Sequence, residues 1–467
     1  MKQEKTAALR ENPTGALAGL SLALLLSSLG TSIANVALPT LGDAFAAPFP
    51  QVQWVVLAYL LSSTVLVVGI GRLGDLYGRR RLLLAGLALF TAASALCGLA
   101  PSLPFLIAAR ALQGLGAAAM MALAMAFVGE TVPKERIGSV MGLFGTMSAV
   151  GTALGPSLGG LLIAGFGWPA IFLVTVPFGL SAFALAYRFL PADGASARGH
   201  QFDFVGAGLL AATLLAYALA MTGGRIGGGL PHASLLLAVA AGGFTLFVLR
   251  QRKASAPLIA PAAFRRVGLR AGLAANGLVA TVMMATLVVG PFYLSRALGL
   301  GAVSIGMVMA IGPGLSIVSG IVAGRFVDRF GAPRMTVAGL ATMAVGAIGL
   351  SGLSALFGLA GYIAAMAVLT PGYQLFQAAN NAAVMSGVAA GERGVTSGLL
   401  TLSRNLGLVT GASLMGTVFT LAVGTRDFSV ANPAAVATGM YLTFALAAAL
   451  ILAALALAIP GLRRGAA

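Results

Sequence analysis

The chain has 467 residues, of which 59% are hydrophobic and only 8% are charged. An ordinary soluble domain is roughly half apolar and about a quarter charged, so this composition excludes a soluble globular protein. The formal net charge of +17 comes from 28 Lys and Arg against 11 Asp and Glu, and it raises the alternative of a nucleic-acid-binding protein.

Long charge-free runs follow one another along the chain. A transmembrane helix needs about 20 apolar residues to cross a hydrocarbon core ~30 Å thick. The runs 137–187 and 335–391 are long enough for two spans each, with breaks expected near 165–169 and 354–355. Two further spans, about 104–129 and about 394–422, each contain one arginine. Single spans fit within 12–42, 44–71, 82–109, 204–224, 226–249, 271–295, 297–324 and 428–462. The sequence therefore predicts an all-α membrane protein with 14 transmembrane helices.

The basic residues follow the predicted topology. If the N-terminus is cytoplasmic, 23 of the 28 Lys and Arg lie in cytoplasmic segments, and only Arg225, Arg296 and Arg426 lie in outer loops. This asymmetry satisfies the positive-inside rule, so we expect a multi-pass protein of the inner (plasma) membrane with both termini in the cytoplasm. A nucleic-acid-binding surface would need a folded polar domain, and the polar segments here are short loops. We therefore expect no nucleic-acid partner.

Two segments recur in the second part of the chain. GRLGDLYGRRR at 71–81 is repeated as GRFVDRFGAPR at 324–334, an offset of 253 residues. GTALGPSLGG at 151–160 aligns with GLVTGASLMG at 407–416, an offset of 256 residues. The repeat predicts an N-terminal six-helix bundle at 1–190, two extra transmembrane helices with linkers at 191–269, and a C-terminal six-helix bundle at 270–467. Parallel halves around a midplane site are typical of transporters that work by alternating access.

The 71–81 segment resembles the motif between the second and third helices of the major facilitator superfamily, with Leu76 where that family usually has a basic residue. A carboxylate and several guanidinium groups at a helix–turn–helix can form charge-assisted bonds between neighbouring helices. We interpret the segment as a conformational latch, with Glu130 as the expected partner of an arginine; the alternative is a solvated basic loop. The latch residues are Gly71, Asp75, Gly78, Arg79, Arg80, Glu130 and, in the second repeat, Asp328.

Two arginines lie inside predicted spans. FLIAARALQGLGAA at 105–118 resembles the fourth-helix motif of the same family and contains Arg110 and Gln113. An intramembrane arginine costs ~2.5–3.5 kcal/mol on insertion scales and usually faces a cavity, so we expect Arg110 and Gln113 to act in substrate binding or coupling. The alternative is that Arg110 reaches the outer interface along its own helix. Arg404 lies about ten residues into its span and is a second candidate.

The 151–160 segment resembles the fifth-helix motif that this family associates with antiporters. A proline removes one helix hydrogen bond, and closely spaced glycines admit tight packing, so the segment can bend and seal against a neighbour. The alternative is an ordinary glycine-rich packing face. The motif residues are Gly151, Gly155, Pro156, Gly159 and Gly160.

LGTSIANVALP at 29–39 resembles the first-helix signature of fourteen-helix drug/proton antiporters and supplies Asn35 as a further substrate or coupling candidate. That family commonly carries an aspartate where Gly30 stands here, so the usual proton or cation site cannot be transferred to this position. Asp43, at the end of the first span, is the remaining candidate proton acceptor at the outer face, unless it is a solvated loop acid.

The twelfth predicted span carries a polar stripe. Tyr373, Gln377 and Asn380 recur at i, i+4 and i+7, and Gln374 and Asn381 lie on an adjoining face. Amides inside a membrane need partners, and hydrogen bonding between helices, worth ~0.6 kcal/mol per contact, is one explanation. Because this span corresponds to the fourth helix of the first half, we favour substrate contact.

The resemblance implies a secondary active transporter that exports small amphiphilic drugs or metabolites by proton-coupled antiport. A lipid or glycolipid flippase of the same fold is the alternative. Catalysis would need converging acids, nucleophiles or metal ligands, but the chain has only two histidines and no pair of intramembrane carboxylates. No glycine-rich nucleotide-binding loop is present, so we expect no direct use of ATP, no enzyme activity and no metal or cofactor. We expect a monomer whose partners are its substrate, protons and the lipid bilayer.

Overall fold

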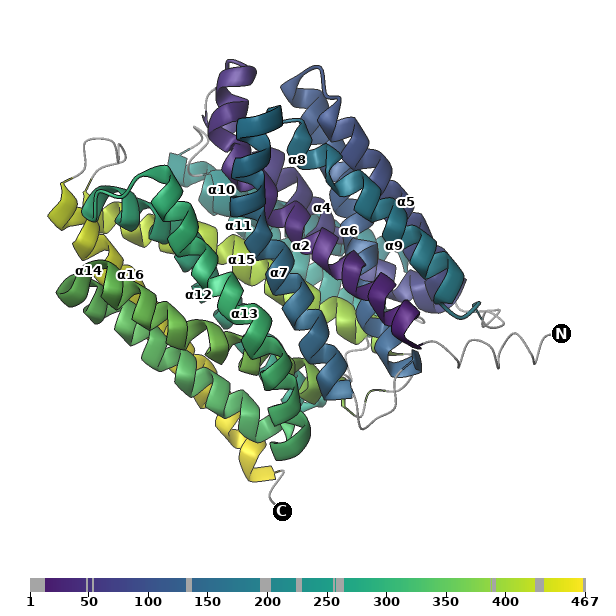
Figure 1. Ribbon diagram of the computed structural model, residues 1–467. Coiled ribbons are helices and arrows are strands. Elements are labelled where there is room, and N and C mark those ends of the chain that lie inside the picture. Colours follow the sequence, from purple (N-terminus) through teal and green to yellow (C-terminus); the bar gives the residue numbers. More distant parts are fainter. Residues whose placement is uncertain are drawn as a thin grey trace. The chain divides into compact units, whose positions relative to one another are not determined.

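Helices make up nearly all of the chain that the structure describes. The computed structural model describes residues 13–47, 49–52, 54–131, 137–193, 203–223, 229–254, 257, 264–386, 388, 392–424 and 432–464, and no strand occurs in these ranges. The all-α class is thus confirmed for the described residues (Figure 1). In chain order the helices are α2 (Pro13–Ala44), α3 (Phe49–Val52), α4 (Trp54–Tyr77), α5 (Arg79–Gly98), α6 (Leu103–Thr131), α7 (Ile137–Phe166), α8 (Ala170–Leu173), α9 (Thr175–Phe189), α10 (Phe204–Gly223), α11 (Gly229–Lys253), α12 (Val267–Phe292), η3 (Tyr293–Ala297), α13 (Ala302–Phe330), α14 (Ala332–Met385), α15 (Arg393–Val423) and α16 (Pro433–Arg464).

Among the described residues, eleven helices are long and apolar enough to cross a membrane. One of them, α14, has 54 residues, and its backbone leaves helical geometry at Gly358 (φ 55°, ψ −126°), so it consists of two helical segments. Two shorter apolar helices lie at Trp54–Val65 and Val205–Met221. The multi-pass class is confirmed, whereas the count of fourteen spans stays a prediction. The break expected near 354–355 lies a few residues later, at a glycine that can adopt a positive φ.

The described residues group into two compact units. Unit 1 falls within Met1–Ile137, Leu154–Arg265 and Gly387–Leu402, and unit 2 within Gly138–Ala153, Arg266–Ser386 and Ser403–Ala467. The paired helices α10 and α11 therefore belong to unit 1, and α7 and α15 each contribute residues to both units. The domain boundaries predicted from the repeat follow sequence similarity rather than contact, and they stay predictions.

The repeat extends to the packing of helices within each unit. In unit 1, α5 and α6 meet so closely that a Cβ on Gly116 would lie 2.7 Å from the carbonyl oxygen of Gly86. In unit 2, the two segments of α14 meet in the same way, and a Cβ on Gly372 would lie 3.0 Å from the carbonyl oxygen of Gly339. Gly339 follows Gly86 by 253 residues and Gly372 follows Gly116 by 256, the two offsets of the sequence repeat. Small residues allow such backbone contact between membrane helices.

The turn of the repeated motif is a single glycine in each half. The sequence places the whole 71–81 segment on a cytoplasmic turn, but α4 stays helical to Tyr77 and α5 begins at Arg79. Gly78 has φ 103°, and Gly331, which follows it by 253 residues, has φ 85°. Only glycine adopts such angles without steric cost, so the glycine at this place in both motifs is explained by the backbone. This corrects the expected position of Asp75, which lies inside α4.

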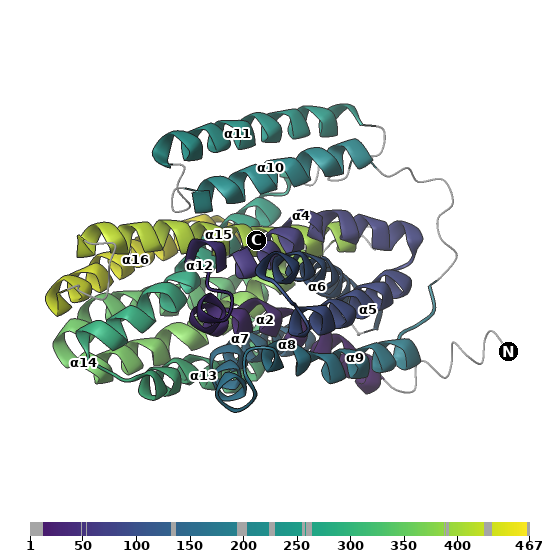
Figure 2. The same cartoon turned by 90° about the horizontal axis from the view of Figure 1, so that it is seen from above.

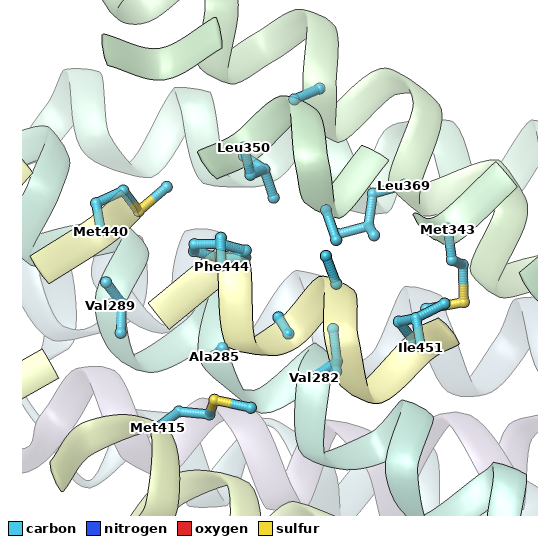
Figure 3. Packing of buried hydrophobic residues seen from close by; sticks show 14 of the residues in the cluster. Val282, Ala285, Val289, Met343, Leu350, Leu369, Met415, Met440, Phe444 and Ile451 are labelled. Carbon is cyan, nitrogen blue, oxygen red and sulfur yellow. The ribbon is translucent and has the colours of Figure 1, made fainter. Parts of the chain in front are cut away.

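The core of unit 2 is apolar and draws on α12, η3, α14, α15 and α16. Figure 3 shows Val282 and Val289 of α12, Leu350 of α14 and Phe444 of α16 packed together, with Met415 of α15 beside them. Each of these side chains has no solvent exposure. Inside lipid, such packing holds helices together by dispersion contacts, because lipid tails are as apolar as the side chains.

The helices α10 and α11 form an antiparallel pair and lie side by side in Figure 2. Asp203 fastens the pair at one end. Asp203 precedes α10, and its Oδ1 accepts from the Gly206 N–H at 2.9 Å, the pattern of a helix N-cap. Gln251 at the end of α11 donates to Oδ2 at 2.9 Å, and Arg250 forms an ion pair with Oδ1 at 3.2 Å. The Asp203 carboxylate therefore joins the two helices.

Substituting Asp203 should weaken this pair in a pH-dependent way. Burial alone would raise the pKa of the Asp203 carboxyl, but the Gly206 N–H, Arg250 and Gln251 hold that pKa below its ordinary value. A depressed folded-state pKa stabilises the protein above the unfolded value of ~3.9, and this contribution is lost as the pH falls through the folded pKa. We expect Asp203→Ala to cost about 1 kcal/mol from the lost cap alone. The measurement is thermal unfolding in detergent from neutral to acid pH.

Asp203→Asn is the control for this prediction, because it keeps an oxygen that can cap α10 and removes the charge. The gap in melting temperature between wild type and Asp203→Asn should close as the pH falls below about 4. A gap that stays constant over the whole range would mean that the charge contributes nothing.

Candidate functional site

Arg110 lies at the centre of a polar cluster that joins several helices of unit 1. Its side chain is 0% exposed. Nε donates to the Val55 carbonyl of α4 at 2.9 Å, and Nη2 donates to the Gly30 carbonyl of α2 at 2.9 Å. Nη1 donates to Oε1 of Gln113 on the same helix, and Gln113 Nε2 donates to Ser94 Oγ of α5 at 2.7 Å. One guanidinium thus connects α2, α4 and α6 and, through Gln113, α5.

Two aromatic rings complete the surroundings of the guanidinium. The Arg110 carbon Cζ lies 4.3 Å from the centroid of the Tyr59 ring and 5.8 Å from that of Phe172. A desolvated cation gains from the negative face of a ring, by about 2 kcal/mol in favourable cases. Tyr59 is itself fixed, because its hydroxyl donates to the Ser27 carbonyl at 2.6 Å. Among the described residues, the cation is therefore stabilised by dipoles and rings and not by a carboxylate.

This placement differs from both expectations for Arg110. The side chain neither faces open space nor reaches an interface, because its partners surround it inside the unit. Asn35, the other candidate from the first half, is exposed on α2, and its amide donates to the Thr31 carbonyl at 3.2 Å. Asp43 is exposed in the last turn of α2. The roles of these residues in binding or coupling stay predictions.

Gly30 stands beside this cluster. A Cβ added there would lie 3.0 Å from Oη of Tyr59, so a side chain at this position would enter the space next to the ring that carries the Arg110 cation. Gly30 has no side chain to offer Arg110, and its backbone carbonyl accepts from the guanidinium.

The glycine face of α7 packs against α2 in unit 1. A Cβ on Gly155 would lie 2.1 Å from Ser32 Oγ, and one on Gly159 would lie 3.2 Å from Ile33 Cγ1. Gly160 faces open space, and Gly151 is buried. The side chain of Pro156 lies outside the described part of the chain. The packing explains Gly155 and Gly159 by close helix approach, and a role in antiport stays a prediction.

Three of the latch residues, Gly78, Arg79 and Arg80, lie at the start of α5. Asp193, which follows α9, accepts from the backbone N–H groups of Arg80 at 2.8 Å and Arg81 at 3.1 Å. Arg80 donates to the Tyr187 carbonyl of α9, and its Cζ lies 5.2 Å from the Tyr187 ring. Arg79 is 9% exposed. A carboxylate at a helix N-terminus satisfies free N–H groups and favours the helix dipole.

Asp193 is a member of this cluster that the sequence analysis missed, because it lies 113 residues from Arg80 and carries no local signal. The side chains of Asp75 and Glu130 lie outside the described residues, so the expected pairing of Glu130 with an arginine stays a prediction. Gly71 is buried in α4. In unit 2, Asp328 at the end of α13 accepts from Ser139 Oγ of α7 at 2.6 Å.

Gly78→Ala should destabilise the protein more than the equivalent change in the second repeat. A Cβ on Gly78 would lie 2.4 Å from Cγ of Asp193, in addition to the cost of a positive φ. Gly331→Ala is the matched control, because Gly331 has the same type of φ with no atom within 4 Å of an added Cβ. We expect Gly331→Ala to lower the free energy of unfolding by about 1–2 kcal/mol and Gly78→Ala to lower it by more. Thermal unfolding measures both effects.

A double-mutant cycle with Asp193→Gly then identifies the contact. If the clash with Asp193 causes the extra loss, the double variant will be less destabilised than the sum of the two single variants. Strictly additive values would refute the role of this contact.

The polar stripe of the second half lies on the second segment of α14, where Gln377 and Asn380 are buried and Tyr373 is half-buried. Gln377 Nε2 donates to the Tyr373 hydroxyl at 2.9 Å. Gln377 is 8% exposed and Asn380 is 2% exposed. Arg404 of α15 donates from Nη1 to Ser148 Oγ of α7 at 3.1 Å within unit 2. The structure thus places these residues inside unit 2 and the Arg110 cluster inside unit 1.

Comparison with known proteins agrees with this architecture. A family model described as Major Facilitator Superfamily matches residues 20–412. The chain is 32% identical over 407 residues to the multidrug resistance protein Stp of Mycobacterium tuberculosis, covering 86% of this chain and 75% of that protein. It is 28% identical over 401 residues to the riboflavin transporter RibZ of Clostridioides difficile, covering 86% of this chain and 87% of that protein. The solved structure of the human organic anion transporter MFSD10 (TETRAN) resembles it with a TM-score of 0.68 and 16% identity, over 96% of this chain and 99% of that chain, a likeness of fold alone.

Proposed function

Because this chain belongs to the major facilitator superfamily, we propose that it exports small amphiphilic molecules across the cell membrane by proton-coupled antiport. The observation that carries the proposal is the 32% identity, across 86% of the chain, to a protein named for multidrug resistance. One relative is a riboflavin transporter, so polar metabolites belong among the cargoes to be tried. Related halves and glycine-lined helix crossings support alternating access as the mechanism.

The proposal assigns different tasks to the candidate residues. Arg110 and Gln113 hold the helices of unit 1 together, and the stripe on α14 with Arg404 contacts the cargo. Asn35 is exposed on α2 and is available to the cargo or to the coupling step. Asp43 is the candidate proton acceptor, because it is an exposed carboxylate at the end of α2.

Transport by reconstituted protein tests the proposal. Proteoliposomes with an acid interior are diluted into a more alkaline buffer, and uptake of a fluorescent amphiphile is followed. Antiport predicts uptake above that of protein-free liposomes, abolished by a protonophore. Uptake that ignores the pH gradient would refute proton coupling. Movement of labelled lipids between leaflets without uptake of any soluble amphiphile would favour the flippase alternative.

We further propose that both termini face the cytoplasm, because the basic residues concentrate on that side of the predicted topology. Reporter fusions test this orientation. A reporter inserted within 193–203 should be cytoplasmic and one within 427–435 external, and the opposite result at either position would contradict the topology.

A further inference from the structure

The second segment of α14 carries several buried polar atoms without a partner. Seven buried side-chain atoms in the described part of the chain have no hydrogen-bond partner, and four of them lie here: Thr370 Oγ1, Gln374 Nε2, Gln377 Oε1 and Asn380 Nδ2. These four residues are between 2% and 8% exposed. Folded proteins pair almost all buried polar groups, because an unpaired one is costly. A cluster of four on one helix indicates groups that are satisfied by something from outside the chain.

Glycines of three other helices in unit 2 lie next to three of these residues. A Cβ on Gly145 of α7 would lie 3.6 Å from Gln374 Oε1, with no other atom within 4 Å. A Cβ on Gly272 of α12 would lie 3.0 Å from Asn380 Oδ1, and one on Gly312 of α13 would lie 3.5 Å from Thr370 Oγ1. No side chain from these three positions covers the polar atoms.

The nearby charge is positive. Gly145 and Ser148 are three residues apart on α7, so they share a helix face and are separated by roughly 4.5 Å along the axis. The first adjoins Gln374, and the second accepts from the Arg404 guanidinium at 3.1 Å. Asp328 is the only carboxylate of unit 2 in the described residues, and it lies in the last turn of α13, where Ser139 donates to it. A cation beside the amides would therefore meet repulsion without a counter-charge.

We propose that Thr370, Gln374, Gln377 and Asn380, the amide face of α14, bind a neutral or monoanionic molecule that carries carbonyl acceptors beside an N–H or O–H donor. Gln374 Nε2 and Asn380 Nδ2 are free to donate. Gln377 Oε1 is free to accept, because Nε2 of the same amide is held by the Tyr373 hydroxyl. An imide edge, with a carbonyl on each side of an N–H, offers the complementary set. This inference rests on the proposed export function, because the ligand class that it names is the class of exported cargo.

Binding to the full-length protein in detergent tests the proposal with three probes. Alloxazine is a neutral fused-ring imide, its N,N-dimethyl analogue lacks the N–H donors, and tetraphenylphosphonium is a lipophilic cation. The wild type should bind alloxazine about tenfold more tightly than the dimethyl analogue, and the cation most weakly. A wild type that binds the three probes equally, or the cation best, would overturn the proposed ligand class.

Apolar variants of similar shape separate binding from folding. Gln374→Met and Asn380→Leu each remove an unpaired polar atom, so the ligand-free melting temperature should stay unchanged or rise by a few degrees. Gln377→Met removes an unpaired oxygen but also the hydrogen bond to the Tyr373 hydroxyl, so its ligand-free melting temperature should fall slightly. Alloxazine affinity should fall about tenfold in each variant. Thr443→Val is the matched control: Thr443 is buried, but its hydroxyl donates to the Gly439 carbonyl at 2.7 Å within α16, and its loss should leave affinity unchanged.

The outcomes distinguish the site from the function. Variants that melt at lower temperature and bind alloxazine like the wild type would show that the amides stabilise the fold, and this would overturn the proposal. If all three variants transport amphiphiles at the rate of the wild type, the proposed site is wrong, and the proposed export function still stands. Specific binding that the variants abolish, without gradient-driven transport by the wild type, would support the site and contradict proton-coupled export.

Discussion

Arg110→Ala is expected to abolish transport and to lower the thermal stability of the purified protein. The substitution removes the donor to the Gly30 and Val55 carbonyls and to the Gln113 amide, in a place that water does not reach. Hydrogen bonds to charged groups contribute about 1.5–3 kcal/mol each to stability, and their contributions are not additive. We therefore expect the free energy of unfolding to fall by at least about 3 kcal/mol. Thermal unfolding in detergent and uptake by proteoliposomes measure the two effects on the same preparation.

Arg110→Lys is the control that separates the effect of the positive charge from that of the guanidinium geometry. Lysine keeps the cation but lacks the planar fork that reaches three acceptors, so it should restore only part of the stability and transport. An alanine variant with wild-type stability and no transport would point to a direct role in coupling, as the sequence alone suggests. An alanine variant that keeps most of its transport would exclude both roles.

Gly30→Asp is expected to shift export towards lipophilic cations, by at least about tenfold relative to neutral amphiphiles, which corresponds to ~1.4 kcal/mol. In the wild type, two buried or half-buried guanidiniums, Arg110 and Arg404, act without a neighbouring carboxylate in the described residues, so we expect neutral and acidic cargo to be preferred. An aspartate at position 30 would project next to Tyr59, whose ring lies 4.3 Å from the Arg110 cation, and would neutralise that charge. Export of matched anionic, neutral and cationic amphiphiles measures the shift.

Gly30→Asn separates the charge from the steric effect, because it has nearly the same shape and also presses against Tyr59. Gly30→Asn should leave the preference for neutral and acidic cargo unchanged, even if it changes the transport rate. A wild type that already prefers cations, together with a Gly30→Asp variant that changes nothing, would refute the charge argument.

Some of this structure was accessible from composition and spacing. Charge-free runs predict membrane helices because lipid excludes unpaired polar groups, and the break expected near 165–169 is confirmed by the end of α7 at Phe166 and the positive φ of Gly167. The stripe of Tyr373, Gln377 and Asn380 was visible as helical periodicity. In the structure Gln377 and Asn380 are buried and Tyr373 is half-buried.

Other features depend on contacts that the sequence does not mark. An intramembrane arginine must be satisfied, but its acceptors here are backbone carbonyls of α2 and α4, which every residue type possesses. Asp193 meets the start of α5 across 113 residues, so only the fold brings them together. Asp203 is different, because an aspartate just before an apolar run is a recognisable N-cap signal and could have been identified.

The crossing of the two segments of α14 has a consequence for directed evolution of cargo specificity. Gly372 and its neighbour Phe376 adjoin the backbone of the first segment so closely that substitutions there must move whole helices. The residues of the amide face lie on the same segment, and none of them is among the neighbours that the crossing glycines Gly339 and Gly372 meet. Libraries that diversify Gln374, Gln377 and Asn380 and keep Gly339 and Gly372 constant should therefore yield many folded members, whereas libraries that vary the crossing will consist mainly of unfolded ones.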